Sequence, residues 1–93
     1  MTDDSSVRDN PALNRFELTV DRQLAFGAYE REGPVIAFVH TVVPEALEGR
    51  GIGSRLISGA LDQVRARGLK VRPDCSFVRG FIESHAEYQD LLA

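Results

Sequence analysis

The sequence predicts an α+β domain in which a small, mainly antiparallel sheet carries two or three packed helices. Three strand patterns occupy the first half of the chain and are separated by turn residues. An amphipathic helical pattern then runs over residues 53–67, and a fourth strand pattern follows at residues 69–73. Because a helical crossover separates this fourth strand from the third, we expect the two strands to run parallel, with a right-handed connection.

The three early strands are expected at residues 16–20, 23–31 and 35–43. The first alternates apolar and polar side chains, which is the period of a strand with one buried face. The third is apolar on both faces, so we expect it at the centre of the sheet. The turns between them are short, and an antiparallel meander is the simplest arrangement that short turns allow.

The helix over residues 53–67 has an apolar stripe and a charged outer face, which is typical of a helix packed on a sheet. The stripe consists of Ile52, Leu56, Ile57, Ala60, Leu61 and Val64. Gly68 follows it as a C-terminal stop. Apolar residues at helical spacing predict a second helix over residues 75–84, and a short last turn or helix ends near residue 92.

Length and composition favour one domain, residues 12–93, preceded by a mobile tail of residues 1–11. The tail is polar and acidic, unlike a signal peptide, and no apolar run approaches the ~20 residues of a membrane span. The net charge is −3, which argues against nucleic-acid binding by bulk electrostatics, and one cysteine excludes an intrachain disulfide. We therefore expect a cytoplasmic protein with no nucleic-acid, membrane or metal partner. The oligomeric state stays open.

A glycine-rich turn between the third strand and the helix carries the clearest chemical signal. Glycines stand at positions 49, 51 and 53, directly at the start of the helical pattern. The first N–H groups of a helix have no partner inside it and the helix dipole is positive there, so the turn suits a pyrophosphate. A structural alternative is a helix start whose glycines serve close packing.

Two well-known phosphate motifs do not fit this turn. A P-loop requires Lys followed by Ser or Thr after its last glycine, and here Gly53 is followed by Ser54 and Arg55. The dinucleotide fingerprint requires a third glycine at the position that Leu56 occupies. What remains is a Gly-x-Gly pattern that opens a helix after an apolar strand.

This pattern, Gly51-Ile52-Gly53 continuing to Leu56, resembles the acetyl-CoA signature of the GNAT superfamily of N-acetyltransferases. With residues 40–44 before it and residues 73–78 after it, the chain is similar to the small single-domain subgroup of that family over roughly residues 16–92. The resemblance implies a GNAT-like fold, acetyl-CoA as cosubstrate and a primary amine of unknown identity as acceptor. Glu48 stands where the signature has Gln or Arg and places a negative charge near the phosphates.

By position, the resemblance implies two groups of cofactor contacts. The main chain late in the third strand would pair with the pantetheine arm, and the N–H groups of residues 49–54 would hold the pyrophosphate. The two arginines of the turn would reach phosphates or adenosine, or else remain solvated surface charges. The full cofactor set is Thr41, Val42, Val43, Gly49, Arg50, Gly51, Ile52, Gly53, Ser54 and Arg55.

Cys75 is the first candidate catalytic side chain. It follows the fourth strand and opens a helix, and a helix N-terminus lowers the pKa of a thiol. The resemblance places it where many family members have Asn at the start of an Asn-x-x-Ala-x-x-x-Tyr pattern, and Ile82 then stands where the tyrosine acid is expected. Cys75 can act as a nucleophile that forms an acetyl-cysteine, line the acyl pocket, or be an ordinary buried small side chain.

His40 is the second candidate, as a general base whose ordinary pKa lies near neutrality. The alternative is a structural histidine that is hydrogen-bonded between the sheet and a helix. A Cys–His pair with Cys75 requires the sheet to bring the two residues together.

Three classes of function follow. The leading hypothesis is an acetyl-CoA-dependent N-acetyltransferase. The second is a non-catalytic acyl-CoA-binding module, which the residues Glu48 and Ile82 favour. The third is a small protein-interaction domain whose glycine turn is structural and which has no affinity for CoA.

Overall fold

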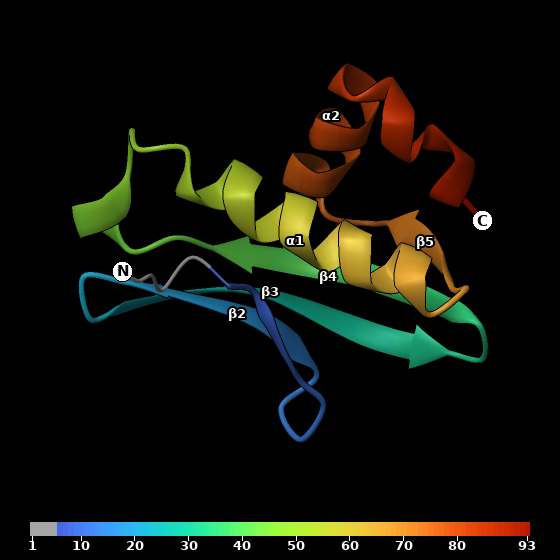
Figure 1. Cartoon of the computed structure of the whole chain (residues 1–93), viewed down its shortest axis with the longest axis horizontal. Helices are drawn as coiled ribbons and strands as arrows, with labels where there is room; N and C mark the ends of the chain where they lie inside the picture. The colour runs from blue at the N-terminus through green and yellow to red at the C-terminus, as the bar shows by residue number, and fades with distance from the viewer. Residues whose placement is uncertain (1–5) are drawn as a thin grey trace.

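A five-stranded sheet with the strand order β1-β2-β3-β4-β5 forms the base of the fold (Figure 1). This computed structural model describes residues 6–93, so residues 1–5 of the predicted tail lie outside the described residues. The strands are β1 (Arg8–Asn10), β2 (Arg15–Val20), β3 (Gln23–Glu32), β4 (Val35–Val42) and β5 (Lys70–Pro73). The first four pair antiparallel in sequence order, and β5 pairs parallel to β4. The predicted α+β fold with a meander and a parallel crossover strand is confirmed, with one strand more than expected.

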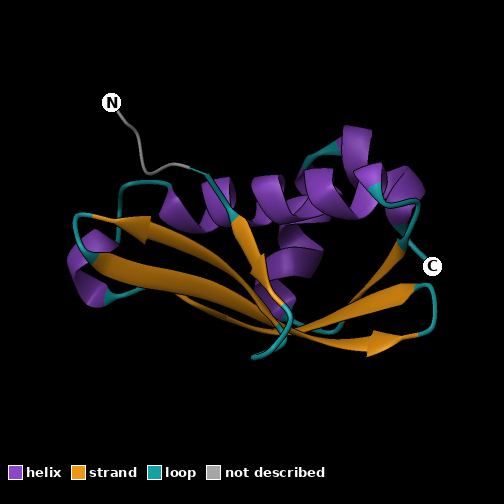
Figure 2. Ribbon diagram, turned by 60° about the horizontal axis from the view of Figure 1, so that its bottom comes forward, coloured by secondary structure: helices purple, strands orange, loops and turns teal. Residues whose placement is uncertain are grey.

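The helices are η1 (Glu45–Leu47), α1 (Ile52–Ala66), α2 (Ser76–Ser84) and η2 (Ala86–Leu91). In Figure 2, α1 crosses one face of the sheet, and α2 packs beside α1 next to β4 and β5. Every residue of the predicted apolar stripe of α1 is buried. No helix within residues 6–93 has the length and apolar character needed to cross a membrane.

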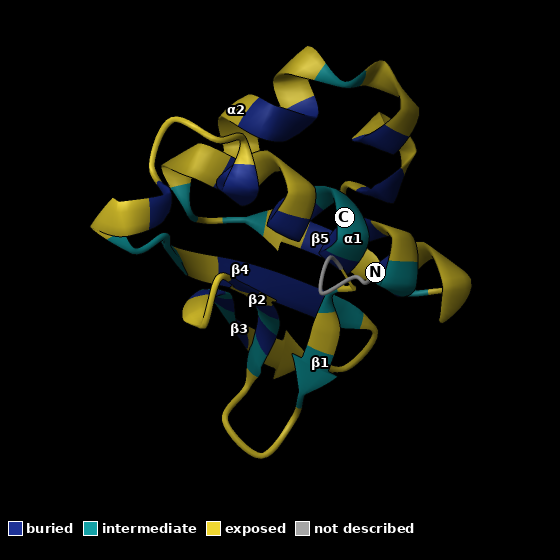
Figure 3. Cartoon of the chain, turned by 60° about the vertical axis from the view of Figure 1, so that its left-hand side comes forward, coloured by how far each residue is buried: buried dark blue, intermediate teal, exposed yellow. Residues whose placement is uncertain are grey.

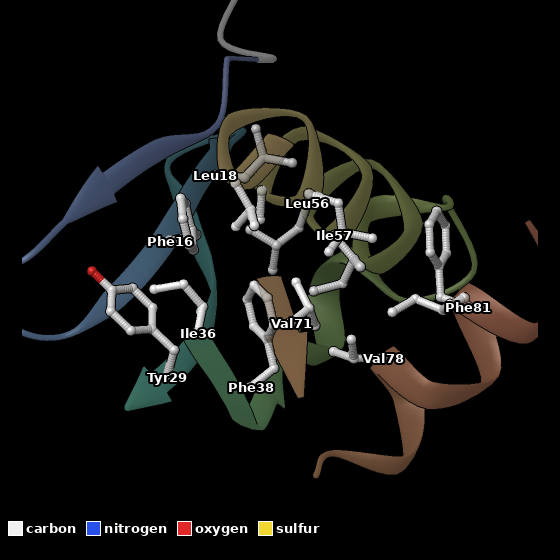
Figure 4. Packing of buried hydrophobic residues seen from close by; sticks show 14 of the residues in the cluster. Phe16, Leu18, Tyr29, Ile36, Phe38, Leu56, Ile57, Val71, Val78 and Phe81 are labelled. Carbon is white, nitrogen blue, oxygen red and sulfur yellow. The ribbon is translucent and has the colours of Figure 1, made fainter. Parts of the chain in front are cut away.

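The core lies between the sheet and the helices. Phe16 on β2 and Phe38 on β4 pack with centroids 5.9 Å apart, and both are fully buried. Figure 4 shows Leu56 and Ile57 of α1 and Val78 of α2 meeting these strands in one cluster. Each such side chain contributes about 1.5–3 kcal/mol when buried, so this cluster holds α1 and α2 against the sheet.

The strand β1 corrects the prediction of a mobile tail for residues 8–10. It pairs with β2 at the edge of the sheet, where Figure 3 shows it, and its Asp9 accepts hydrogen bonds from Tyr29 (2.7 Å) and Arg67 (2.7 Å). Just before it, the carbonyl of Val7 accepts a hydrogen bond from Gln63 of α1 (2.6 Å). The polar sequence of this segment does not predict a strand. Ion pairing and backbone pairing hold this strand in place, and an apolar face does not.

A β-bulge interrupts β4 shortly before its end. Tyr29 on β3 pairs with Phe38, but the adjacent Ala28 pairs with His40, so that Val39 is an extra residue on β4. Since side chains alternate between the two faces of a strand, the bulge inverts the alternation of the residues that follow it. Phe38 faces α1, His40 therefore faces the opposite side of the sheet, and Thr41, which pairs with the buried Gly27, faces the helices.

Candidate functional site

Two residues of the glycine turn have a backbone conformation that favours glycine. Gly49 and Gly51 have φ of 81° and 73°, in the left-handed region that side chains other than glycine rarely adopt. Gly51 is the N-cap of α1 and caps the helix with no side-chain hydrogen bond, and Arg55 is the first residue whose N–H bonds back to the Gly51 carbonyl (3.1 Å). The N–H groups of residues 52–54 therefore have no partner within the helix. The surroundings of Gly49 and Gly51 are open, because a Cβ added at either position would have no heavy atom within 4 Å.

Gly53 serves a different purpose from the other two glycines. It lies inside α1, and a Cβ at this position would stand 2.8 Å from the ring Cζ of Phe77 in the first turn of α2. The first turns of α1 and α2 thus lie in direct contact. The close-packing explanation for a glycine at a helix start holds for this position, whereas the backbone explanation holds for Gly49 and Gly51.

A hollow of about 230 Å³ opens between the turn and α2, and we call it the turn hollow. Its lining residues are Val43, Leu47, Glu48, Gly49, Gly51, Ile52, Gly53, Ser54 and Phe77. Most of the predicted pyrophosphate set lines this hollow. Glu48 lines it too, so the negative charge noted in the sequence does lie at the turn.

The pairing of β4 with β5 ends at the bulge. Their last pair joins Phe38 to Pro73, and the N–H of Cys75 donates to the carbonyl of Phe38 (2.8 Å). Residues 39–42 of β4 continue beyond this point, while the chain after β5 turns away into α2. Thr41, Val42 and Val43 therefore have no pairing partner in β5.

Cys75 lies just beyond this last pair, as the N-cap residue of α2. Its Sγ is 3.3 Å from Oγ1 of Thr41, and it is partly buried against the core. Burial raises the pKa of the Cys75 thiol, but the hydroxyl of Thr41 and the backbone N–H groups of Val78, Phe77 and Thr41 outweigh it and hold the pKa below its ordinary value. The direction of this shift is the one expected of a thiol at a helix N-terminus.

His40 and Cys75 do not form a Cys–His pair in this structure. The bulge turns His40 to the face of the sheet that α1 does not cover, where it is exposed, whereas Cys75 contacts Thr41 on the helix side. The structural alternative for His40, a ring held between sheet and helix, is also absent from this position. His40 remains a candidate base for a group that approaches from the open face.

The two arginines of the turn differ. Arg50 donates to Asp21 in the turn between β2 and β3 (2.7 Å), and both side chains are exposed. Arg55 points outward from α1 and lines a second hollow of about 390 Å³ with Asp62 and Glu87. Neither arginine lines the turn hollow.

Sequence reasoning missed Phe77 as part of this site. The sequence indicated only apolar residues at helical spacing over residues 75–84, yet Phe77 is 43% exposed and lines the turn hollow. A signal was present in the glycine at position 53, which permits a large side chain to approach α1. No sequence pattern identified which residue would use that space.

Comparisons with known proteins agree with this geometry. Residues 15–91 match the family model described as GCN5-related N-acetyl-transferase. The protein NATD1 from Bos taurus is 34% identical over 58 residues, which cover 61% of this chain and 51% of that protein, and NATD1 from Mus musculus is 34% identical with 53% of its length covered. The chain thus spans about half the length of the curated relatives it matches.

The fold also has a solved counterpart. The solution structure of a protein from Staphylococcus aureus described as GCN5-like superimposes with a TM-score of 0.74 at 26% identity, over 99% of this chain and 91% of that one. Because the family model covers nearly the whole described domain, the chain belongs to the GCN5-related N-acetyltransferase family.

Proposed function

We propose that the protein is an acetyl-CoA-dependent N-acetyltransferase that transfers an acetyl group to a primary amine. The observation that carries this proposal is the continuity of the site. The turn hollow touches the start of α1, Val43 just after β4 and Phe77 in the first turn of α2. Two residues before each of the latter two positions, Thr41 and Cys75 are in contact at 3.3 Å.

Each part of the site suits one part of the cofactor. The N–H groups of residues 52–54 would hold the pyrophosphate, because the helix dipole and the unpaired donors both favour an anion. The main chain of residues 41–43, which has no pairing partner in β5, would pair with the pantetheine arm. Acetyl-CoA supplies the activated thioester, and the residues around Cys75 act on the acetyl end.

Cys75 is proposed as the nucleophile. Its thiolate Sγ attacks the acetyl carbonyl carbon, the bond from that carbon to the CoA sulfur breaks, and CoA leaves as a thiolate. The amine then attacks the acetyl-cysteine, which restores the thiolate of Cys75 and leaves the acetyl group on nitrogen. The amine proton passes to a base or to water, and His40 lies on the opposite face of the sheet from Cys75.

A binding assay tests the cofactor site. Gly51→Val should raise the Kd for acetyl-CoA at least about tenfold, because its side chain would strain the turn and occupy the space above the N–H groups. Gly33→Val is the matched control, since Gly33 also has a positive φ (59°) and open surroundings but lies in the β3–β4 turn away from the site. No binding by a folded wild-type protein would overturn the proposal and leave the protein-interaction domain.

The second candidate is a non-catalytic acyl-CoA-binding module. It is favoured by Ile82, which stands at the position of the family tyrosine, is 2% exposed and belongs to the core. Incubation with acetyl-CoA followed by mass spectrometry distinguishes the two functions. An acetyl group on Cys75, lost on addition of an amine and absent in Cys75→Ser, supports catalysis. Tight binding without any acetyl transfer supports the binding module.

A further inference from the structure

The helices α1 and α2 both pack on the same face of the sheet. α1 contacts the strands β2 to β5, and α2 contacts β4 and β5. In Figure 1 both helices lie above β2 and β3, and no helix lies below these two strands. We call the face that these helices leave uncovered the open face. Because an antiparallel sheet can have one face in water, the side chains of the open face show whether it suits solvent.

The middle of the open face is apolar, where a solvated face would be polar. The odd-numbered residues of the range 25–29 on β3 are buried beneath the helices, so Leu24, Phe26 and Ala28 point to the other side. Val42 of β4 pairs with Phe26 in the ladder and extends this apolar surface to the next strand. Leu24 is 36% exposed, so part of the row lies open to solvent.

Charged side chains lie on both sides of this apolar row. On β2, Arg15 and Glu17 form an ion pair (2.7 Å), and Cζ of Arg15 lies 4.5 Å from the centroid of the Phe26 ring. On β5, Arg72 pairs with Glu32. An apolar centre with a polar rim is the usual anatomy of a protein–protein interface.

Two opposite charges stand at the two ends of the row. Arg22 lies in the turn before β3 and Glu30 lies near the end of that strand, and both are exposed. Neither has an ion-pair partner within residues 6–93. The two residues are equally far from Phe26 along the chain. The row is therefore self-complementary, because its basic end meets its acidic end when a second row is turned end for end.

The turn of residues 11–14 adds an apolar side chain at one edge of the open face. It joins β1 to β2, and in Figures 1 and 3 it extends away from the helices. Leu13 in this turn is 57% exposed, more than any other large apolar side chain that the structure describes. The turn lies at the Ala28 end of the row, since Arg15, which follows the turn, pairs with Ala28. In an end-for-end arrangement it lies nearest to the Leu24 end of the second row.

The open face is also large enough for a specific interface. A strand residue occupies about 3.4 Å along the strand and about 4.8 Å across it, so the five strands give this face a flat area of roughly 500 Å². Two such faces together bury roughly 1,000 Å², which is what a specific interface needs. Pairing through the edge strand β1 is less suitable, because β1 has three residues and all are polar.

We propose that the open face binds the open face of a second copy of this chain. The two copies form a symmetric dimer in which the β3 strands stack in opposite directions, with the two-fold axis beside Phe26. Arg22 of each copy then meets Glu30 of the other. Glu17 lies level with Phe26, and Arg15 already neutralises it within its own copy. The inference is independent of the proposed function.

The mass in solution tests the dimer. Sedimentation equilibrium between about 1 and 500 µM should show the wild type approaching twice the 10.3 kDa of one chain, with a micromolar Kd. Leu24→Asp should raise this Kd about thirtyfold or more, because it buries a charge at the apolar centre of both copies. Leu92→Asp is the matched control, since Leu92 is 42% exposed but lies beside β5, beyond the far edge of the sheet.

A charge exchange tests the orientation of the two copies. Arg22→Glu and Glu30→Arg should each raise the Kd of their own dimer about fivefold or more, because each brings like charges together twice. An equal mixture of the two variants should dimerise about as well as the wild type, since both contacts between unlike copies are then attractive. Thermal unfolding of each variant verifies that it is folded.

Three results would overturn the proposal. One is a wild type that keeps the mass of a single chain at the highest concentration, as expected if a different protein covers this face. The second is a dimer whose Kd is the same in Leu24→Asp as in Leu92→Asp. The third is a mixture of Arg22→Glu and Glu30→Arg that dimerises no better than either variant alone, which would exclude the antiparallel stacking of β3.

Discussion

The ring of Phe77 and the backbone of Gly53 are in direct contact, and this contact joins the first turns of two helices that are far apart in the sequence. A methyl group on residue 53 cannot be accommodated unless the ring moves, since it would lie 2.8 Å from Cζ. Phe77 is 43% exposed, so its ring has room to move outward, but it would then no longer line the turn hollow.

This contact predicts an energetic coupling between the two residues. In a Phe77→Ala background, Gly53→Ala should stabilise the protein by about 0.5–1 kcal/mol, because alanine is the better helix former. In the wild-type background this gain should disappear, since the ring must shift. Denaturant unfolding of the four proteins measures the coupling. Equal effects of Gly53→Ala on the free energy of unfolding in both backgrounds would show that the two residues are not energetically coupled.

The thiol of Cys75 should react at lower pH than an ordinary cysteine, because its pKa is held down by Thr41 and the backbone N–H groups. Thr41→Val removes the hydroxyl but keeps the shape of the side chain, so the pKa of Cys75 should rise and the pH profile of alkylation by iodoacetamide should move to higher pH. Thr41→Ser retains the hydroxyl and should leave the profile nearly unchanged. A pH profile that is the same in all three proteins would show that the Thr41 hydroxyl does not lower the pKa of Cys75.

Tyr29 should make the protein sensitive to alkali. Burial and then the hydrogen bond to Asp9 raise the pKa of Tyr29 from 10.0 to about 12. The folded state therefore keeps a proton that the unfolded state loses above pH 10, so the free energy of unfolding should fall between pH 10 and 12, by about 2–3 kcal/mol in total.

The control for this effect is Tyr29→Phe, which has no proton to lose at that position. Urea unfolding at several pH values should show a shallower alkaline decline for this variant than for the wild type. Tyr88→Phe tests whether the decline is specific, because burial also raises the pKa of Tyr88, though Ser58 opposes it. A wild-type decline as shallow as that of Tyr29→Phe would contradict the assignment.

Arg50 is engaged by Asp21 in the free protein, at 2.7 Å and with both side chains exposed. Asp21→Asn should release the guanidinium for a phosphate at the neighbouring turn, and asparagine tolerates the positive φ of 50° at this position. Exposed ion pairs contribute little, so stability should change by less than about 0.5 kcal/mol. Titration should show the Kd for acetyl-CoA falling about two- to threefold, and an unchanged Kd in both Asp21→Asn and Arg50→Ala would exclude a phosphate role for Arg50.

The sequence was sufficient to predict most of the fold, because its signals are local. The apolar stripe of α1, the stop at Gly68 and the turn glycines each act within a few residues. The helix start at the glycine turn and the position of Cys75 as the N-cap of α2 followed from the same kind of reasoning. Residues 8–10 were misjudged because their contacts, from Asp9 to Tyr29 and Arg67, are with residues distant in the chain.

The candidate site was harder to predict because it depends on side-chain direction as well as position. The sequence left open whether the sheet would bring His40 to Cys75, and the extra residue Val39 determines the face on which His40 lies. A bulge has no reliable residue signature, so the faces of the last residues of β4 could be known only from the pairing with β3. The same applies to Phe77, whose contact with Gly53 arises from packing.

The bulge also determines what kind of genetic change this strand can tolerate. Substitution of Val39 by another β-branched residue leaves the chain the same length and keeps Thr41 beside Cys75. Loss of the Val39 codon would join Phe38 directly to His40, and the pairs of Tyr29 with Phe38 and of Ala28 with His40 would then follow one another in regular alternation. His40 and Thr41 would therefore keep the faces they have. Loss of a codon at a regularly paired position such as Ile36 would instead move the side chains on one side of the deletion to the opposite face. Natural length variation in this strand should therefore occur at position 39 rather than at its regularly paired positions.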